Sequence, residues 1–122
     1  MVFHMWSYAI GTGVLAQGGE TRGRGYAGRG QGRNNIAMIR VAMMGPIPPG
    51  RYRIGKAYDH PLLGPVTMNL EPLPGTQMFG RSLFRIHGDN KAGDASQGCI
   101  VLGRTLRESI AQSGDDQLDV TA

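Results

Sequence analysis

The sequence is short of cysteine, of charge and of long apolar runs, and each shortage excludes a class of protein. Cys99 is the only cysteine among 122 residues, so neither an intramolecular disulfide nor a cysteine-rich zinc site can form. Charged residues amount to 18% against 40% hydrophobic residues, which is globular composition. The apolar runs are too short to cross a bilayer. We therefore expect one soluble domain over residues 1–122, with a single core.

Signals for export and for metal binding are also missing. The N-terminal stretch MVFHMWSYAIGTG lacks the basic start, the long apolar segment and the cleavage site of a secretory signal, so we expect no Sec-type export. His4 and His60 have no cysteine or carboxylate at ligand spacing, so we expect no metal site and no cofactor. A net charge of +4 and a pI near 9.7 favour an anionic partner, which charge alone leaves open between nucleic acid, a membrane surface and bacterial cell wall.

What the chain does contain is turn-forming residues. Twenty glycines and seven prolines predict short strands joined by turns, and thus a mainly β fold. The segments at 4–10 and 14–17 are expected to pair as a hairpin around the turn at 11–13. Residues 18–35 have almost nothing to bury and predict a long surface loop. Further strands are expected at 35–43, at 51–58 after a rigid proline turn at 45–50, at 66–72, at 82–87 and, as an edge strand, at 117–121.

Only one segment has the apolar spacing of a helix. Leu102, Leu106 and Ile110 recur every four residues, and Gly114 stands where a helix C-cap is expected. In the strand at 66–72, by contrast, Val66, Met68 and Leu70 alternate on one face. These patterns predict a single short helix over residues 103–114.

The stretch FRIHGDNKAGDASQGCIVL contains the candidate chemistry. A catalytic thiol needs a base nearby and backbone N–H groups that can hold an oxyanion. Gly98 lets substrate approach the backbone before Cys99, and the N–H groups of both residues can point at one oxygen. His87 ends an apolar strand and precedes Gly88, so its ring can enter a cleft as a general base. The structural alternative is a buried cysteine preceding three apolar residues, with a structural histidine.

The order of several motifs resembles a known family. HG followed by ASQGCIVL is similar to the signature of the L,D-transpeptidase (YkuD-like) family, and GPIPPGRYRIG is similar to the proline-rich turn before a central strand there. An aromatic-rich strand, a TG turn and GYAGRGQGRNN resemble more narrowly the small L,D-transpeptidase-like proteins delivered by type VI secretion. The chain departs from the family at Gln97, where a basic residue or histidine is usual, and at Val101, where arginine is usual. Papain-like and NlpC-type peptidases place cysteine before histidine, the reverse of this chain.

The resemblance implies an L,D-transpeptidase-like β-sandwich with one short helix after the catalytic strand. It implies that Cys99 attacks the bond between the third residue and D-alanine of a tetrapeptide stem, that His87 moves the proton, and that the Gly98 and Cys99 N–H groups hold the oxyanion. Ser96 would orient the histidine or shape the turn. Hydrolysis, exchange with a D-amino acid and crosslinking all remain open as outcomes. The residues expected to contact substrate are Gly88, Gln97 and Arg85.

The resemblance also implies partners and a place of action. Peptidoglycan stem peptides would be the substrate, an immunity protein would protect the producer, and a secretion-system carrier would deliver the chain to the periplasm of a target bacterium. Neither nucleic-acid binding nor membrane insertion is expected.

Two other interpretations remain open. Arginines interleaved with glycines resemble a short RNA-binding segment; in a wall enzyme they would instead draw the anionic sacculus or bind a stem-peptide carboxylate. A wall-peptide-binding module without catalysis also fits. Asp89 and Asp94 either hydrogen-bond the histidine or are solvated turn formers. The arginines of the possible RNA-binding segment are Arg22, Arg24, Arg29 and Arg33.

Overall fold

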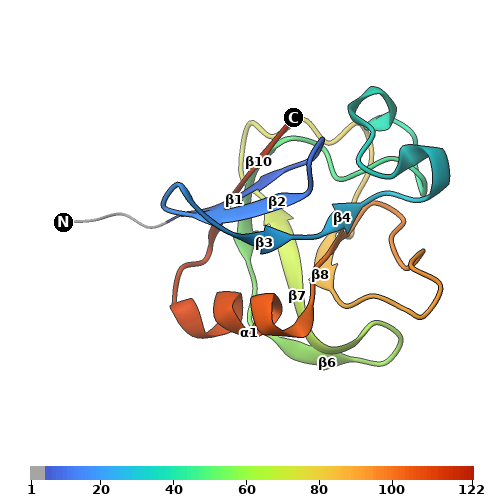
Figure 1. Cartoon of the computed structure of the whole chain (residues 1–122). Coiled ribbons are helices and arrows are strands. Elements are labelled where there is room, and N and C mark those ends of the chain that lie inside the picture. The colour runs from blue at the N-terminus through green and yellow to red at the C-terminus, as the bar shows by residue number, and fades with distance from the viewer. Residues whose placement is uncertain (1–4) are drawn as a thin grey trace.

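The computed structural model describes residues 5–122 and is mainly β with a single α-helix, as the sequence predicts (Figure 1). The strands are β1 (Trp6–Ala9), β2 (Val14–Gln17), β3 (Glu20–Arg24), β4 (Tyr26–Ala27), β5 (Gly50–Ile54), β6 (Tyr58–His60), β7 (Gly64–Pro72), β8 (Arg85–His87), β9 (Ile100–Val101) and β10 (Gln117–Thr121). Two 3-10 turns, η1 (Gly30–Gly32) and η2 (Ile36–Met38), and the helix α1 (Arg104–Ser113) complete the fold.

The strands form one path that nearly closes on itself. Their order is β3-β2-β1-β10-β5-β7-β8-β9-β4, with β6 paired to β7 outside the path. Because only Gly25 separates β3 from β4, the two ends of the path are joined by a single residue. A Cβ atom on Gly25 would collide with the carbonyl oxygen of Val101, so the junction requires glycine. Closure in this way leaves few exposed strand edges.

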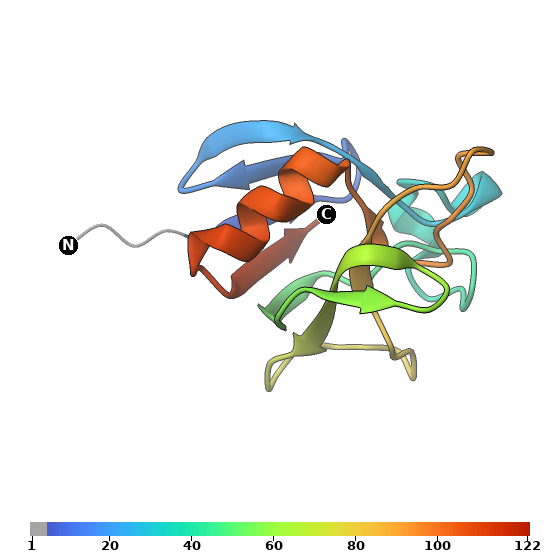
Figure 2. The same cartoon turned by 90° about the horizontal axis from the view of Figure 1, so that it is seen from below.

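The core lies inside the curled sheet. Along β1, Trp6 and Tyr8 are buried while their neighbours are only partly so, which is the period of two of a strand with one inner face. Leu118 of β10 is fully buried between its register partners Trp6 and Tyr52. Ile110 of α1 is buried in the same cluster, and both Figure 1 and Figure 2 place α1 on the side of the strands where β6 lies. The helix therefore covers the core where the sheet leaves it open.

Several predicted elements are confirmed. β1 and β2 form the expected antiparallel hairpin, although His4 of the predicted strand lies outside the described residues. The strand at 66–72 lies within β7. The helix spans all but the ends of the predicted segment, and Gly114 has the left-handed conformation expected of a C-cap (φ 72°).

Other predicted elements are wrong, each for a local reason. The segment 18–35 is not wholly a loop, because β3 pairs with β2 although its side chains are mostly exposed, and β4 pairs with β9 while burying Tyr26 and Ala27. The segment 35–43 forms η2 and turns, since the Asn35 side chain accepts from the N–H of Ala37 and caps the 3-10 turn. β10 is not an edge strand, because β1 pairs with it on one side and β5 on the other. The segments 51–58 and 82–87 are strands over only part of their length.

Candidate active site

A tight turn held by Ser96 presents Cys99 just before β9. The buried Ser96 hydroxyl donates to the carbonyl of Cys99 at 2.6 Å and accepts from the N–H groups of Gly98 at 3.0 Å and Gly28 at 2.9 Å. These bonds fix the Ser96–Cys99 turn and tie it to the segment after β4. Of the two roles expected for Ser96, its hydrogen bonds therefore support shaping the turn. The Gly98 N–H is already engaged here, so the oxyanion role expected of it gains no support from this geometry.

The sheet register brings His87 to the same face as Cys99. β8 and β9 run parallel with His87 opposite Val101, which places Arg85 opposite Cys99 one step before β9. Since side chains alternate between faces, His87 and Cys99 project to one face as diagonal neighbours. His87 Nδ1 lies 2.7 Å from the carbonyl oxygen of Gly88. A carbonyl only accepts, so Nδ1 carries the proton and Nε2 keeps the lone pair that a general base needs.

Both side chains line one open groove of about 600 Å³. Three exposed apolar residues also line it: Leu62 is 89% exposed, Leu83 75% and Met43 66%. Met43 and Leu83 have left-handed backbones, with φ of 65° and 64°. Non-glycine residues held in this region cost free energy, and such strain clusters at ligand sites. Sequence reasoning missed this rim, because no spacing of apolar residues marks it.

Burial favours the uncharged form of both Cys99 and His87, so it shifts their two pKa values in opposite directions. It raises the pKa of the Cys99 thiol, against the hydrogen bond at 3.3 Å from the Arg85 N–H and the charges of Arg85 and Arg81. It lowers the pKa of His87, aided by the charges of Arg107 and Arg85 and opposed by the Gly88 carbonyl and Asp89. The resting pair is thus a neutral thiol beside a neutral imidazole, which allows proton transfer only as the thiol attacks.

Arg81 is a site residue that the sequence analysis missed. Its side chain is 8% exposed and donates to the carbonyls of Ile39 at 2.6 Å, Pro46 at 2.8 Å, Gly45 at 2.8 Å and Gln97 at 3.3 Å. It thereby joins the loop before β5 to the turn that carries the thiol. In the sequence Arg81 is distinguished only by its position before the strand that ends at His87, and this position alone does not predict a function.

The residues expected to contact substrate are all near the site but differ in exposure. Gln97 has an exposed side chain on the groove, and Arg85 also lines it, with its Nε donating to Asn69 Oδ1 at 3.1 Å. Gly88 serves mainly as the acceptor for His87. A Cβ atom on Gly98 would lie 2.6 Å from Arg81 Nη2, so this glycine (φ +133°) is required by packing.

The loop between His87 and Cys99 is anchored to β4. Asp89 accepts from the hydroxyl of Tyr26 at 2.6 Å, and the same hydroxyl accepts from the N–H of Ala95 at 3.1 Å. Asp94 accepts from the Asn90 side chain at 2.8 Å. Neither carboxylate is hydrogen-bonded to His87, so both act as turn formers. Asp89 also ties the loop to Tyr26 of β4. Figure 1 shows this loop beside the 3-10 turns, at one end of the molecule.

Residues 5–122 contain neither a cluster of metal ligands nor a membrane-spanning helix. Over residues 5–122, no group of three or more histidine, cysteine, aspartate or glutamate side chains is arranged to hold a metal ion. The single helix in this part of the chain is too short and too polar to cross a membrane.

Fold and site together define a small β-rich domain whose cysteine and histidine share one open groove. A family model, the Tlde1 domain, matches residues 21–120, which is most of the chain. The chain therefore belongs to the Tlde1 domain family, whose members are antibacterial type VI secretion effectors with peptidoglycan-modifying activity. No curated protein matches the sequence. The predicted relation to type VI effectors is confirmed, while the wider resemblance to YkuD-like enzymes stays a prediction.

Proposed function

We propose that the protein is a cysteine L,D-carboxypeptidase and exchange enzyme, which acts on the bond between the third residue and D-alanine of tetrapeptide stems. The observation that carries this proposal is the shared groove of Cys99 and His87, with Nδ1 of His87 bound to Gly88 and Nε2 left as the base. Membership of the Tlde1 family supports peptidoglycan as the substrate class.

The chemistry follows from the neutral resting pair. Cys99 Sγ attacks the carbonyl of the third stem residue while Nε2 of His87 takes the thiol proton. The tetrahedral intermediate collapses, the C–N bond breaks, and the imidazolium returns the proton to the leaving D-alanine amine. A thioester remains on Cys99. The oxyanion falls beside the Cys99 N–H, and the nearby charges of Arg81 and Arg85, which already favour the thiolate, also favour this anion.

The groove is open to solvent, so more than one acceptor can resolve the thioester. Water releases a tripeptide, a free D-amino acid replaces the lost D-alanine, and a second stem amine gives a crosslink. In each case Nε2 of His87 takes a proton from the acceptor and Cys99 leaves as the thiol. The apolar rim of Met43, Leu62 and Leu83 offers a surface for the body of the peptide or for an apolar D-amino acid.

The proposed function includes partners and a place of action. A type VI effector with this chemistry acts in the periplasm of the target cell, where loss of tetrapeptide donors weakens the growing wall. Its producer needs an immunity protein that blocks the groove or the effector as a whole, and a secretion-system carrier that delivers it. Co-purification of the chain with a neighbouring gene product that abolishes turnover would establish the first of these partners.

Mass spectrometry of disaccharide tetrapeptide incubated with the protein tests the activity. We expect loss of the terminal D-alanine in buffer and its replacement when D-methionine is added, with both reactions absent in Cys99→Ala. An unchanged tetrapeptide in the presence of folded wild-type protein would refute the enzyme and leave a wall-peptide-binding module. Binding of single-stranded RNA under the same conditions, with no effect on tetrapeptide, would instead favour the arginine and glycine segment as the functional site.

A further inference from the structure

A second pocket lies on the same face of the sheet as the groove. It has a volume of about 470 Å³. Its floor includes Tyr26 and Val101, and register pairs Val101 with His87 on one side and with Tyr26 on the other. The three side chains therefore form one row across β8, β9 and β4, so the pocket lies within two strand spacings of the proposed base, roughly 10 Å. The loop between His87 and Cys99 contributes Asp89 to this pocket and Ala95 to the groove.

The walls of this pocket carry positive charge that the protein does not neutralise. Arg24, Arg33 and Arg107 line it against one carboxylate, Asp89, which already accepts from Tyr26 and from the Asn90 backbone. Across residues 5–122 the only ion pair is between Arg104 and Glu108, so none of the three arginines has an acidic partner there. We call these three side chains and the space between them the arginine pocket.

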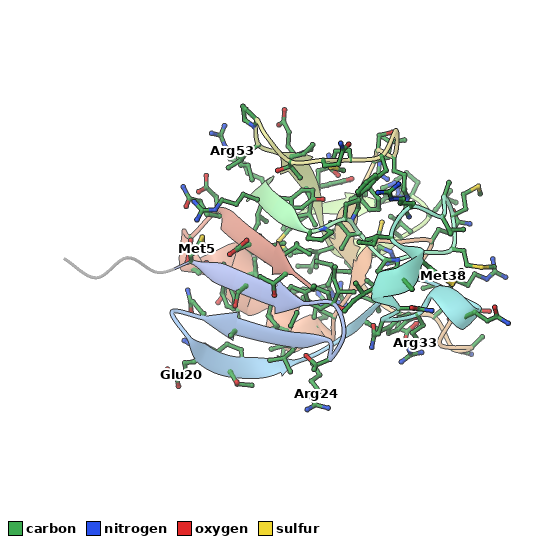
Figure 3. All side chains as sticks on the ribbon, turned by 90° about the horizontal axis from the view of Figure 1, so that it is seen from above. Met5, Glu20, Arg24, Arg33, Met38 and Arg53 are labelled. Atoms are coloured by element: carbon green, nitrogen blue, oxygen red, sulfur yellow. The ribbon has the colours of Figure 1, made fainter. Side chains whose placement is uncertain are left out.

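Each arginine reaches the pocket in a different way. Arg24 is exposed at the end of β3, and Arg33 lies 3.8 Å above the ring centre of Tyr26, with one N–H bound to the Gly93 carbonyl at 3.2 Å. Arg107 is 7% exposed and is fixed by the carbonyls of Leu102 and Pro65. Two of the three are thus held in place before any ligand arrives, and the third can close over it. Figure 3 shows Arg24 and Arg33 at the edge of the molecule, away from Arg53.

We propose that the arginine pocket binds a carboxylate of the peptidoglycan substrate. Guanidinium groups pair with carboxylates through two parallel hydrogen bonds, and none of the three arginines has an acidic partner among residues 5–122. The proposal rests on the proposed function, which supplies stem peptides and D-amino acids as the carboxylates present. The pocket lies on the β4 side of β9, whereas His87 lies on β8, so the pocket holds a part of the substrate that does not react.

Occupation of the pocket also reaches the base through charge. His87 faces Arg107 of α1, Arg85 of β8, Asp89 of the loop and the Gly88 carbonyl, and the Arg107 charge is among those that lower the pKa of His87. A carboxylate on Arg107 offsets that effect. Bound substrate should therefore raise the pKa of His87 above its value in the free protein, a change that a merely structural arginine would not produce.

Calorimetric titration of Cys99→Ala protein with disaccharide tetrapeptide tests the proposal without turnover. Arg24→Glu should weaken binding by about tenfold or more, because the new glutamate repels the carboxylate of the ligand. Arg24→Gln, which only removes the positive charge, should weaken binding by less. Arg53→Glu is the matched control, since Arg53 is equally an exposed strand arginine, makes the same change in net charge and lies outside the pocket. It should change binding less than about twofold. Equal effects of Arg24→Glu and Arg53→Glu would overturn the proposal.

Two further binding measurements identify the source of the carboxylate, and thermal unfolding excludes misfolding as the cause of weaker binding. Weaker binding of tetrapeptide with amidated carboxylates identifies the stem, whereas loss of D-methionine binding in Arg24→Glu identifies the free amino acid; either result supports the pocket. Amidation without effect, together with D-methionine binding that survives Arg24→Glu, overturns it. Unchanged thermal unfolding shows that each variant is folded. If wild-type protein turns over tetrapeptide but the arginine variants bind it normally, only this inference fails; if wild-type protein does not turn it over, the proposed function fails.

Discussion

The two ends of this small sheet are built in different ways. Around β1, β2, β10 and β5, strands of four or five residues pair in continuous register and bury alternate apolar side chains. Around β8, β9 and β4 the strands have two or three residues, and turns, left-handed residues and a buried arginine hold the groove. The first region owes its shape to hydrophobic burial, whereas the second combines the buried Ile86 and Ile100 with polar contacts that shape the groove.

This difference predicts where substitutions act. In the regular region they should lower stability and leave the activity of the folded fraction intact. In the groove they should lower activity more than stability, because Cys99, His87 and Arg81 lie outside the buried apolar cluster. The following experiments test whether effects on stability and effects on activity separate between the two regions in this way.

The largest effect is expected at the nucleophile. Cys99→Ala should reduce L,D-carboxypeptidase turnover by about a thousandfold or more, because no other thiol is present to form the acyl intermediate. Its midpoint of thermal unfolding should stay near that of wild type, since the side chain is only partly buried. Mass spectrometry of the products and calorimetry of unfolding measure the two. Substantial turnover by the variant would remove Cys99 from the mechanism.

A core substitution in the regular region should behave in the opposite way. Leu118→Ala should cost about 3 kcal/mol of the free energy of unfolding, since the side chain is fully buried between Trp6 and Tyr52. Turnover per folded molecule at low temperature should change little. Urea unfolding gives the first quantity, and the fraction folded under the assay conditions follows from the same transition. A drop in turnover as large as the drop for a groove variant would show that the two regions are coupled.

An intermediate case is Arg81, which belongs to the groove but is buried. Arg81→Met should lower kcat/KM by about tenfold to a hundredfold, because the Gln97–Cys99 turn loses its link to the loop at 39–46. Its unfolding free energy should fall by about 1–3 kcal/mol, as four carbonyl groups lose their donor. Arg53→Met serves as a control with the same loss of charge at an exposed site. A variant that lost stability alone would make Arg81 structural.

The smallest effect concerns pH. Burial lowers the pKa of His87 below its usual 6.5, so the acid limb of kcat/KM should have its midpoint below that value: protonated His87 cannot accept the thiol proton, and protonation is delayed to lower pH. Burial raises the pKa of Cys99, so alkylation by iodoacetamide in the absence of substrate should increase only above the usual range for cysteine. Fast alkylation of free protein at neutral pH would contradict the neutral resting pair.

Sequence patterns predicted the elements that bury a regular face. The spacing of Leu106 and Ile110 with Gly114 predicted α1, and the glycine turn predicted the hairpin of β1 and β2. They failed where backbone pairing or capping decides the structure without apolar side chains. β3 pairs with β2 although it contains glycine and arginine and is mostly exposed, β4 has only two residues, too few to show a period, and η2 replaces a strand because Asn35 caps it.

The candidate site shows the same division. The HG and SQGC motifs led to His87 and Cys99, which the register brings to one face. The oxyanion role of Gly98, by contrast, is unsupported, since Ser96 holds its N–H. Arg81 and Arg107 had no signal, because buried arginines bound to backbone carbonyls leave no partner of opposite charge in the sequence. Contacts between distant segments are what such patterns cannot encode.

The position of β10 has a consequence for the order in which the protein is made. A chain synthesised only as far as α1 already contains Cys99 and His87, but β1 and β5 then face each other across a missing strand. Their facing edges lack the ladder partner that β10 supplies, and the core lacks the buried side chains of Leu118 and Val120. The nascent chain therefore carries Cys99 and His87 before the strands around its core can pair completely, and we expect the groove to become stable only when Gln117–Thr121 is inserted between β1 and β5.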